Sequence, residues 1–191
     1  MLLHPELGSW TVIGSVITDM PLEEDSKKLP DGCGTCRRCS VDCPTSAIDE
    51  FGVLDANRCL AWLLQAKGIF PRQYRAALGN RLYGCDDCQV LCPVNDTAIE
   101  GSRAAVPRED KVDIVALLDA SDEDLMDQYG HWYIPRRRPE YLRRNALVVL
   151  GNSRIGDSPE VERVLANCLA SPHALVRSHA VWAVLRLGKR H

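Results

Sequence analysis

Eight of the nine cysteines fall into two blocks with the spacing of iron–sulfur ligands. The blocks read Cys33-x2-Cys36-x2-Cys39-x3-Cys43-Pro44 and, after a separate Cys59, Cys85-x2-Cys88-x3-Cys92-Pro93. A [4Fe–4S] cubane needs four thiolates, and a tight loop with a cysteine at every third residue reaches only three of its corners. The fourth ligand of each cubane must come from elsewhere in the chain. The spacing therefore predicts two cubanes in a chain that carries electrons.

The cysteines divide between the two predicted clusters by a crossover. In bacterial ferredoxins with two clusters, the cysteine that precedes the proline ligates the cluster of the other run. One cluster is therefore assigned to Cys33, Cys36, Cys39 and Cys92, and the other to Cys43, Cys59, Cys85 and Cys88. Cys59 replaces the missing first member of the second run, because two cubanes require eight ligands. Residues 60–84 are then an insertion within the second motif.

Two other uses of these cysteines fit the pattern less well. Zinc sites pair two separated Cys-x2-Cys units, whereas three cysteines in a row followed by Cys-Pro suit one tetrahedral ion poorly. Disulfides are not expected, because 191 residues can bury a core without them and we find no signal peptide. Cys168, flanked by Leu165 and Leu169 in a helical pattern, is expected to be a small buried apolar residue.

The formal net charge of −3 conceals an uneven distribution. Residues 1–135 carry 12 Lys and Arg against 22 Asp and Glu, and residues 136–191 carry 11 against 4. A basic C-terminal part of this kind is expected to face a polyanion. The chain has no run of 18 apolar residues, so we expect no membrane span and a cytoplasmic protein of one or two domains.

Residues 10–18, WTVIGSVIT, are apolar and β-branched without a helical stripe, which is typical of a buried strand. A buried strand needs neighbours for its backbone groups, and no other convincing strand follows. We therefore expect its partners in a part of the protein missing from this chain, as in a truncated or split gene product. The alternative is a short edge piece folded onto the cluster domain.

The rest of the chain reads as a polar linker at residues 21–31 and helices beyond the first cysteine block. Helices are expected at residues 59–67, 71–82, 110–129, with Ser121 as an N-cap, and 160–169. In the last 50 residues Leu142-Arg143 with Ala146 and Leu150 matches Val176-Arg177 with Ala180 and Val184 at an offset of 34. This repeat favours HEAT-like helix pairs, and an ordinary helical bundle is the alternative.

Several short motifs resemble one known family. They are Gly8-Ser9-Trp10, Thr18-Asp19 with Pro21-Leu22, the run from Cys33 to Pro44, Gly79-Asn80-Arg81, Tyr83-Gly84-Cys85-Asp86-Asp87-Cys88-Gln89, Arg136-Arg137-Arg138, Leu142-Arg143-Arg144-Asn145-Ala146 and Leu150-Gly151-Asn152. With these motifs the chain resembles epoxyqueuosine reductase over essentially all its residues, but only over the C-terminal half of that family's length. The string from Tyr83 to Gln89, combined with the split second cysteine motif, is the most specific part.

The resemblance implies an enzyme with a cobalamin-binding catalytic domain, a two-cluster ferredoxin domain and a HEAT-like tail. Such an enzyme reduces epoxyqueuosine to queuosine in the tRNA anticodon, with the clusters passing electrons to cobalamin. The family's proton donor lies in the absent N-terminal domain, so no catalytic residue is named here. The cobalamin contacts that map onto this chain are Gly8, Asp19, Asp86, Asp87 and Gln89. The implied partners are tRNA, an external electron donor and a separate N-terminal cobalamin-binding chain.

Five arginines at the start of the basic segment are candidate tRNA contacts. They are Arg136, Arg137, Arg138, Arg143 and Arg144, and His131, Trp132 and Tyr133 precede them. Guanidinium groups bind phosphate well, and aromatic rings can stack on the unpaired bases of an anticodon stem-loop. We expect the arginines to dock tRNA, with a solvated charged face as the alternative. Packing explains Trp132 and Tyr133 more simply than base stacking does.

The expected fold is mainly α with a small α+β ferredoxin-like domain. Residues 1–24 would be a remnant strand of a cobalamin-binding domain, 25–105 the two-cluster domain, 106–135 an acidic helical linker and 136–191 the HEAT-like tail. Three functions are compatible with this organisation: the electron-delivery and tRNA-docking half of an epoxyqueuosine reductase, a stand-alone two-cluster ferredoxin serving another reductase, and a zinc-bearing interaction module.

Overall fold

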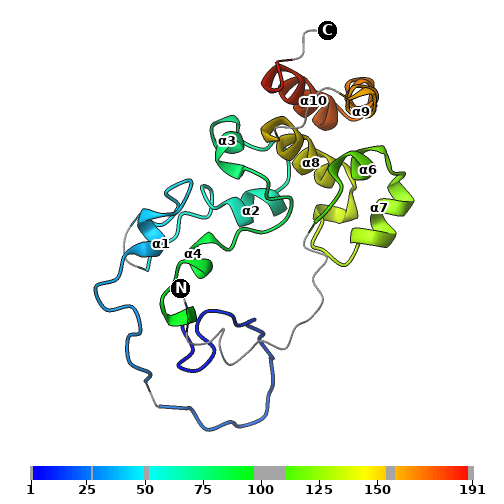
Figure 1. The fold of residues 1–191 in the computed structure, drawn as a ribbon. Coiled ribbons are helices and arrows are strands. Elements are labelled where there is room, and N and C mark those ends of the chain that lie inside the picture. The colour runs from blue at the N-terminus through cyan, green and yellow to red at the C-terminus, as the bar shows by residue number, and fades with distance from the viewer. Residues whose placement is uncertain (1, 27, 50–51, 97–110, 154–157, 189–191) are drawn as a thin grey trace. The chain divides into compact units, whose positions relative to one another are not determined.

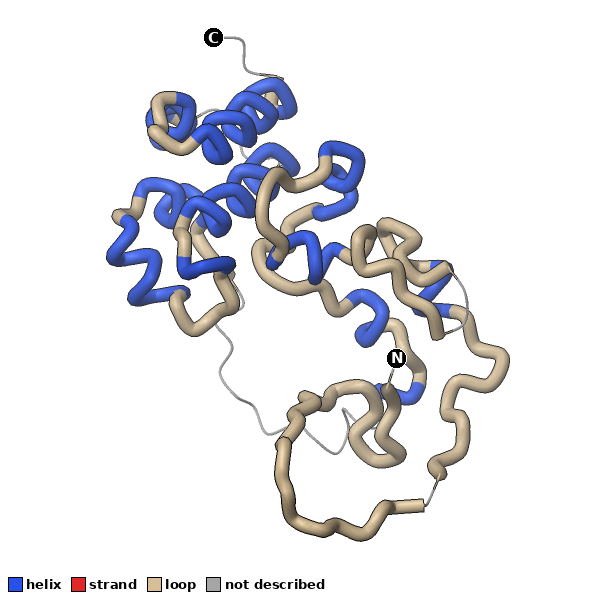
Figure 2. Tube along the Cα trace, turned by 180° about the vertical axis from the view of Figure 1, so that it is seen from behind, coloured by secondary structure: helices blue, strands red, loops and turns tan. Residues whose placement is uncertain are grey.

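The structure is a computed structural model that describes residues 2–26, 28–49, 52–96, 111–153 and 158–188. Its regular elements are helices (Figures 1 and 2). They are α1 (Arg38–Val41), α2 (Leu60–Gln65), η1 (Arg72–Tyr74), α3 (Arg75–Leu78), α4 (Asp87–Val90), α6 (Ile114–Asp119), α7 (Asp122–Tyr129), η2 (Pro135–Arg137), α8 (Glu140–Asn152), α9 (Pro159–Leu169) and α10 (Ala174–Arg186). None of the helices in these ranges is long and apolar enough to cross a membrane.

The chain divides into two compact units. The first, here called the cluster unit, comprises residues 1–53 and 86–106, and the second, the helical unit, comprises residues 54–85 and 107–191. The expected two-cluster domain of residues 25–105 is thus shared between them. The insertion between the two cysteine runs packs with the tail, because its apolar side chains belong to the same core as those of α8.

The cluster unit buries little apolar surface. Among its described residues the buried apolar side chains are Ala47 and Cys92, and the buried polar ones are Ser9, Thr45 and Asn95. A unit of this size with so small an apolar interior gains little free energy from the hydrophobic effect. Metal or cluster ligation is therefore the expected source of its stability.

The prediction of a buried strand at residues 10–18 is wrong for this chain. That segment forms neither helix nor strand, and the β-structure of the described residues is limited to isolated bridge residues, such as the antiparallel bridge between His4 and Gly8. The side chains of Val12 and Ile17 are fully exposed. The β-branched pattern describes a surface that suits a sheet, but the described part of the chain supplies no neighbouring strand with which its backbone groups can pair.

The helical unit has two apolar clusters, and α8 contributes to both. One gathers side chains of α6, α7, α8, α9 and α10 around the buried Leu147, Leu165 and Ala180. The other sets Val148 and Val149 of α8 against α2, Phe70 and Leu78. Helix α8 is consequently buried on nearly all sides, and it connects the tail helices to the insertion between the cysteine runs.

The tail helices agree with the predicted repeat in their spacing. Helices α8 and α10 are each 13 residues long and begin 34 residues apart, which matches the predicted offset, and α9 lies between them in the chain. Helix α10 packs against both α8 and α9. Cys168 on α9 is buried among apolar side chains, as predicted. The HEAT-like character of the tail stays a prediction.

Side-chain caps account for several helix starts. The Asp113 carboxylate accepts hydrogen bonds from the backbone N–H groups of Val115 and Ala116 at the start of α6. Ser121, the predicted N-cap, accepts one from Asp124 N at 3.1 Å at the start of α7. Such caps satisfy backbone donors that have no partner inside the helix. The predicted helical region of residues 110–129 therefore contains two helices in its described part.

Candidate iron–sulfur centre

The two cysteine runs fold in the same way. In each run a four-residue helix, α1 or α4, has a cysteine as its second residue, Cys39 or Cys88. The residues before the helices, Arg37 and Asp86, have φ/ψ of −129°/15° and −113°/15°. The residues after them have −93°/1° and −90°/−1°. Equal spacing and equal backbone conformation mean that both runs present their cysteines in the same local geometry.

Superposing the runs along the sequence shows what the second one lacks. Cys36, Cys39 and Cys43 correspond to Cys85, Cys88 and Cys92 at a constant offset of 49 residues. The same offset places Leu82 opposite Cys33. Within the cluster unit α1 and α4 also pack against each other, as in an internal repeat. The first ligand of the second run must therefore come from another position, for which Cys59 is the predicted candidate.

The thiols of the first predicted cluster act on one another electrostatically. Burial raises the pKa of Cys33 most, and the carboxylate of Asp31 raises it further. The negative charges of Cys39 and Cys92 act in the same direction. Three of the four predicted ligands thus lie within electrostatic reach, where a bound cation would reverse the effect and favour the thiolates. Cys92 is 7 % exposed, so this site is partly shielded from solvent.

Cys43 has hydrogen-bond donors around its sulfur. The backbone N–H of Ala47 lies 3.2 Å from Sγ, and the Thr45 hydroxyl lies 3.8 Å from it. Burial by itself raises the pKa of Cys43, but hydrogen bonds from the backbone of Thr45, Ala47 and Ile48 and from the Thr45 side chain outweigh it and lower the pKa. Hydrogen bonds to sulfur stabilise a thiolate and tune the potential of a cluster that it ligates.

The donor set fits iron–sulfur ligation in its chemistry. The seven cysteines of the two runs and Cys59 are all free thiols. Within the described ranges no three His, Cys, Asp or Glu side chains come close enough together to hold one metal ion. The four predicted ligands of the first cluster lie in the cluster unit, whereas Cys59 and Cys85 belong to the helical unit.

A buried polar network joins the N-terminal segment to the second cysteine run. Asn95 accepts a hydrogen bond from Ser9 N at 2.7 Å and donates to Ser9 Oγ at 2.8 Å and to Gln89 O at 2.6 Å. Gln89 in turn donates to Ser9 O at 2.7 Å. Gly8 has φ +60°, and a Cβ there would lie 2.1 Å from Asn95 Oδ1, so only glycine fits. Ser9 and Asn95 were not predicted as site residues, and no pattern in the sequence marks them as a pair.

The predicted cobalamin contacts are only partly brought together. Gly8 and Gln89 share the network around Asn95. Asp86 and Asp87 lie at the start of α4, and Asp19 is exposed in a segment without regular structure. The Gln89 amide nitrogen is already occupied by Ser9, which leaves its oxygen for a further partner. The network around Asn95 therefore has a structural role of its own, and the cobalamin contacts stay a prediction.

Cys59 and Cys85 are held by the core of the helical unit. Cys59 is the N-cap residue of α2, whose Leu60, Leu63 and Leu64 are buried. Cys85 packs against the same apolar cluster from the other cysteine run. Both thiols are partly exposed. The predicted replacement ligand and the first remaining predicted ligand of the second run are thus attached to one apolar core.

Arg144 is not available to a nucleic acid, which corrects its prediction as a tRNA contact. Its side chain is fully buried and donates hydrogen bonds to four backbone carbonyl groups and to Asn145 Oδ1. Burial lowers its pKa to about 10. Arg143 is engaged as well, with the Asp122 carboxylate and, at 2.8 Å, with Ala120 O. The arginine run was read as one surface, but the helical period turns Arg144 into the core.

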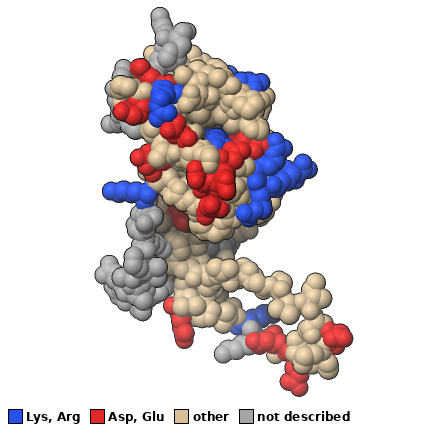
Figure 3. All heavy atoms as spheres, turned by 90° about the vertical axis from the view of Figure 1, so that its right-hand side faces the viewer, with Lys and Arg blue, Asp and Glu red and all other residues tan. Residues whose placement is uncertain are grey.

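Arg136, Arg137 and Arg138 do lie at the surface. Arg138 pairs with Glu140, and Arg137 donates to Gly130 O at 3.1 Å. Arg136 and Arg137 both have positive φ, 54° and 53°, a conformation that costs non-glycine residues about 1–3 kcal/mol. On the face drawn in Figure 3, Lys and Arg gather along one side, next to a group of Asp and Glu.

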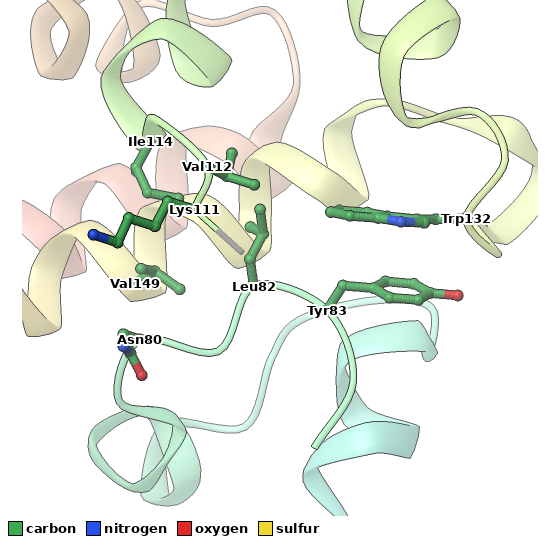
Figure 4. Close-up of a pocket in the computed structure, with 8 residues that line it drawn as sticks. All are labelled: Asn80, Leu82, Tyr83, Lys111, Val112, Ile114, Trp132 and Val149. Carbon is green, nitrogen blue, oxygen red and sulfur yellow. The ribbon is translucent and has the colours of Figure 1, made fainter. Parts of the chain in front are cut away.

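Of the two larger aromatic residues before the arginines, Trp132 packs within the helical unit, whereas the side chain of Tyr133 is exposed. Trp132 stacks on Tyr83 with ring centroids 4.7 Å apart, and Tyr83 Oη accepts a hydrogen bond from Tyr133 N at 2.8 Å. Tyr133 itself is 61 % exposed. Figure 4 shows the stacked pair at one end of a cavity of about 490 Å³ in the helical unit, with Lys111 near the other end. Trp132 therefore has the packing role expected for it.

The comparison with known families supports the prediction of a two-cluster domain. Residues 32–95 match the family described as a 4Fe-4S double cluster binding domain. That range includes every cysteine except Cys168.

Relatives match almost the whole chain. An uncharacterised protein encoded 3′ of gldA in Geobacillus stearothermophilus is 34% identical over 186 residues, which cover 96% of this chain and 85% of that protein. Epoxyqueuosine reductase of Staphylococcus aureus is 36% identical over 191 residues, covering 96% of this chain and 48% of the enzyme. A crystal structure of epoxyqueuosine reductase with an epoxyqueuosine-modified tRNA-Tyr stem loop matches with a TM-score of 0.80 and 31% identity, over 99% of this chain and 50% of that one. The chain thus spans about half the length of the reductases it matches.

Proposed function

Because this chain belongs to the epoxyqueuosine reductase family, we propose that it is the part of such an enzyme that delivers electrons and docks tRNA. The observation that carries the proposal is the pair of matching cysteine runs within a double-cluster domain, in a chain similar to the reductases over nearly all its residues. The reaction is the reduction of epoxyqueuosine to queuosine in tRNA. It takes place, on this proposal, in the cytoplasm, where the tRNA is.

The cysteines of the two runs, together with Cys59, hold the electron carriers. Two [4Fe–4S] clusters supply one-electron transfer when bound, and cobalamin supplies the organometallic step. Cys33, Cys36, Cys39 and Cys92 ligate one cluster and Cys43, Cys59, Cys85 and Cys88 the other. The donors around Cys43 Sγ raise the potential of its cluster, because they stabilise negative charge on the sulfur. An external reductant supplies the electrons.

The predicted cobalamin contacts would bind and orient the cofactor. Gly8 lets the chain approach closely, and Gln89 Oε1 can accept a hydrogen bond while its amide nitrogen holds Ser9. Asp86 and Asp87 follow Cys85 directly, and Asp19 ends the N-terminal apolar segment. The proton for the substrate comes from a group outside this chain, in a cobalamin-binding domain or a separate chain.

The arginines of η2 would contact the tRNA. Arg136 makes no ion pair among the described residues, and its left-handed backbone, like that of Arg137, is held in a conformation that few non-glycine residues adopt. Strained backbone conformations of this kind cluster at functional sites. We assign Arg136, Arg137 and Arg138 to contacts with the phosphates of the anticodon stem-loop. Arg143, which is partly buried, supports them, and the buried Arg144 is not part of the proposed tRNA-binding surface.

The division of labour can be tested with purified parts. The chain is loaded with clusters under anaerobic conditions and mixed with the separately produced half of the Staphylococcus aureus enzyme that this chain does not match. Epoxyqueuosine-containing tRNA and a chemical reductant are added, and queuosine is measured by mass spectrometry of the digested tRNA. We expect queuosine only when both parts are present.

The controls separate the alternatives. Queuosine formation by this chain alone contradicts the proposed division of labour. An equal yield without this chain shows that it does not deliver the electrons, as expected for a ferredoxin that serves another reductase. The Cys36→Ser variant, which lacks one cluster ligand, is the matched negative control.

A further inference from the structure

We infer that Arg144 and Asn145 on α8 are positioning residues for the second iron–sulfur cluster. This inference rests on the proposed function, because it presupposes that Cys59 and Cys85 are cluster ligands. Both residues lie in the tail, more than 50 positions after the last cysteine of the motif. Their side chains nevertheless contact the two backbone segments that carry these ligands.

The first of these segments is the end of α2. Arg144 donates from Nη1 to Ala66 O and Gly68 O, each at 2.7 Å, and from Nη2 to Leu64 O at 2.8 Å and Leu63 O at 3.2 Å. The last carbonyl groups of a helix have no partner inside it. One buried guanidinium therefore closes the C-terminal end of the six-residue helix whose N-cap is Cys59. A helix this short is not stable by itself, so its orientation depends on such contacts.

The second segment is the start of the second cysteine run. Asn145 Nδ2 donates to Leu64 O at 3.0 Å and to Leu82 O at 3.3 Å, while its Oδ1 accepts from Arg144 Nε at 3.0 Å. Leu82 is the residue that stands where the first run has Cys33. Asn145 thus joins the position that has no ligand to the helix that supplies Cys59 in its place.

Burial makes this arrangement rigid. Arg144 is 0% and Asn145 3% exposed, so their hydrogen bonds are not exchanged with water. Breaking one leaves a buried carbonyl unsatisfied, which is costly. Arg144 also lies over Phe70 and Tyr141, at 6.0 and 5.3 Å from their ring centroids. The spacing between Cys59 and Cys85 is consequently fixed by the tail and not only by the cysteine runs.

Helix α8 offers a matched control. Asn152, seven residues after Asn145, also donates from Nδ2 to two carbonyl groups, those of Arg75 at 2.7 Å and Gly79 at 3.1 Å. Those carbonyls belong to α3 and its C-cap, a segment without cysteine. Asn152→Ala removes the same kind of contact from the same helix without touching a ligand-bearing segment.

The test compares Asn145→Ala, Arg144→Lys and Asn152→Ala with the parent chain after anaerobic reconstitution. Iron, sulfide, cluster reduction potentials and Tm are measured on each. The single ammonium group of Arg144→Lys cannot reproduce the guanidinium fork. We expect this variant and Asn145→Ala each to lose about four of about eight irons or to shift the potential of one cluster only. Asn152→Ala is expected to lower Tm while both clusters and both potentials are kept.

The result that overturns the inference is equally definite. If Asn145→Ala and Arg144→Lys lower Tm but keep both clusters at the parent's potentials, the pair has a structural role only. The same conclusion follows if Asn152→Ala loses one cluster to the same extent. Should one variant not fold, the other decides. If the parent chain itself binds no iron and sulfide, the proposed function fails, and this inference fails with it.

Discussion

Two buried basic groups, Arg75 and His179, show how the helical unit uses polarity inside its core. His179 Nε2 accepts hydrogen bonds from Phe70 N at 3.2 Å and from Arg75 Nη2 at 3.1 Å, and Nδ1 faces Leu175 O at 2.7 Å. This pattern requires a neutral ring with its proton on Nδ1. Burial, together with the positive charges of Arg75 and Arg144, lowers the pKa of His179 to about 4.

His179 therefore gives the protein a pH dependence with a defined sign. Its pKa is depressed in the folded state, so protons bind first to the unfolded chain as the pH falls below about 6.5. Stability is fully present above that pH and declines toward pH 4, by about 1.4 kcal/mol for each pH unit. Thermal melting across this range should show a smaller decline for His179→Gln, which keeps an acceptor but does not titrate. Identical declines would contradict the account.

The nine cysteines differ in what their removal should do. Cys59→Ser should cost one cluster and about half of the iron, because the second run has no other first ligand. Cys168 is buried, and desolvation raises its pKa to about 11, so it stays a thiol. Cys168→Ser should therefore keep the iron content while lowering stability by about 1–3 kcal/mol for burying a hydroxyl. Iron analysis with melting curves checks both; full iron in Cys59→Ser would remove Cys59 from the ligand set.

Helices α8 and α10 pack closely at Gly151. A Cβ on this residue would lie 2.5 Å from the Trp182 ring and 3.1 Å from Ala183 Cα, and the second of these neighbours is backbone. Gly→Ala in an open helix stabilises by about 1 kcal/mol, but here overpacking should outweigh that gain. Gly151→Ala is expected to destabilise the protein by about 1–3 kcal/mol in denaturant melts. Gly14→Ala, with nothing within 4 Å, is the control and should be near neutral.

The η2 segment carries the proposed tRNA contacts. Phosphate neutralisation releases counterions, so affinity should fall steeply with salt. Replacing Arg136, Arg137 and Arg138 together with Glu should weaken tRNA binding and flatten the salt slope, with iron content unchanged. The control variant replaces the exposed Arg72, Arg163 and Arg186 with Glu, which changes the net charge by the same amount at other places on the surface. Its salt slope for tRNA binding should stay nearer to that of the parent chain. Filter binding measures both; equal slopes for all three proteins would leave η2 a solvated surface.

Local sequence patterns predicted much of the fold and of the candidate cluster site. Contacts between residues distant in sequence explain the features that these patterns missed. The cysteine spacing and the caps at Ser121 follow from chemistry within a few residues, and the double-cluster match agrees. A strand at residues 10–18 was wrong because its formation depends on partners elsewhere. Arg144 was misplaced because charge runs do not show which guanidinium turns inward. Ser9 and Asn95 are 86 residues apart, and neither type marks a site.

The two units divide the proposed work between them. The cluster unit has thiols and a polar network but almost no apolar core, and the helical unit has a large core with basic groups at its surface and inside it. On the proposed function, one unit carries most of the ligands and the other supports the rest and meets the tRNA. Loss of the clusters should therefore affect the first unit's stability more than the second's.

The central claim, two [4Fe–4S] clusters in this chain, is tested most directly by measuring iron, sulfide and zinc together on anaerobically reconstituted protein. The account predicts about eight iron and eight sulfide per chain, no stoichiometric zinc, and a broad visible absorption that bleaches on reduction. Stoichiometric zinc without sulfide would contradict it and would identify the cysteines as ligands of a structural metal.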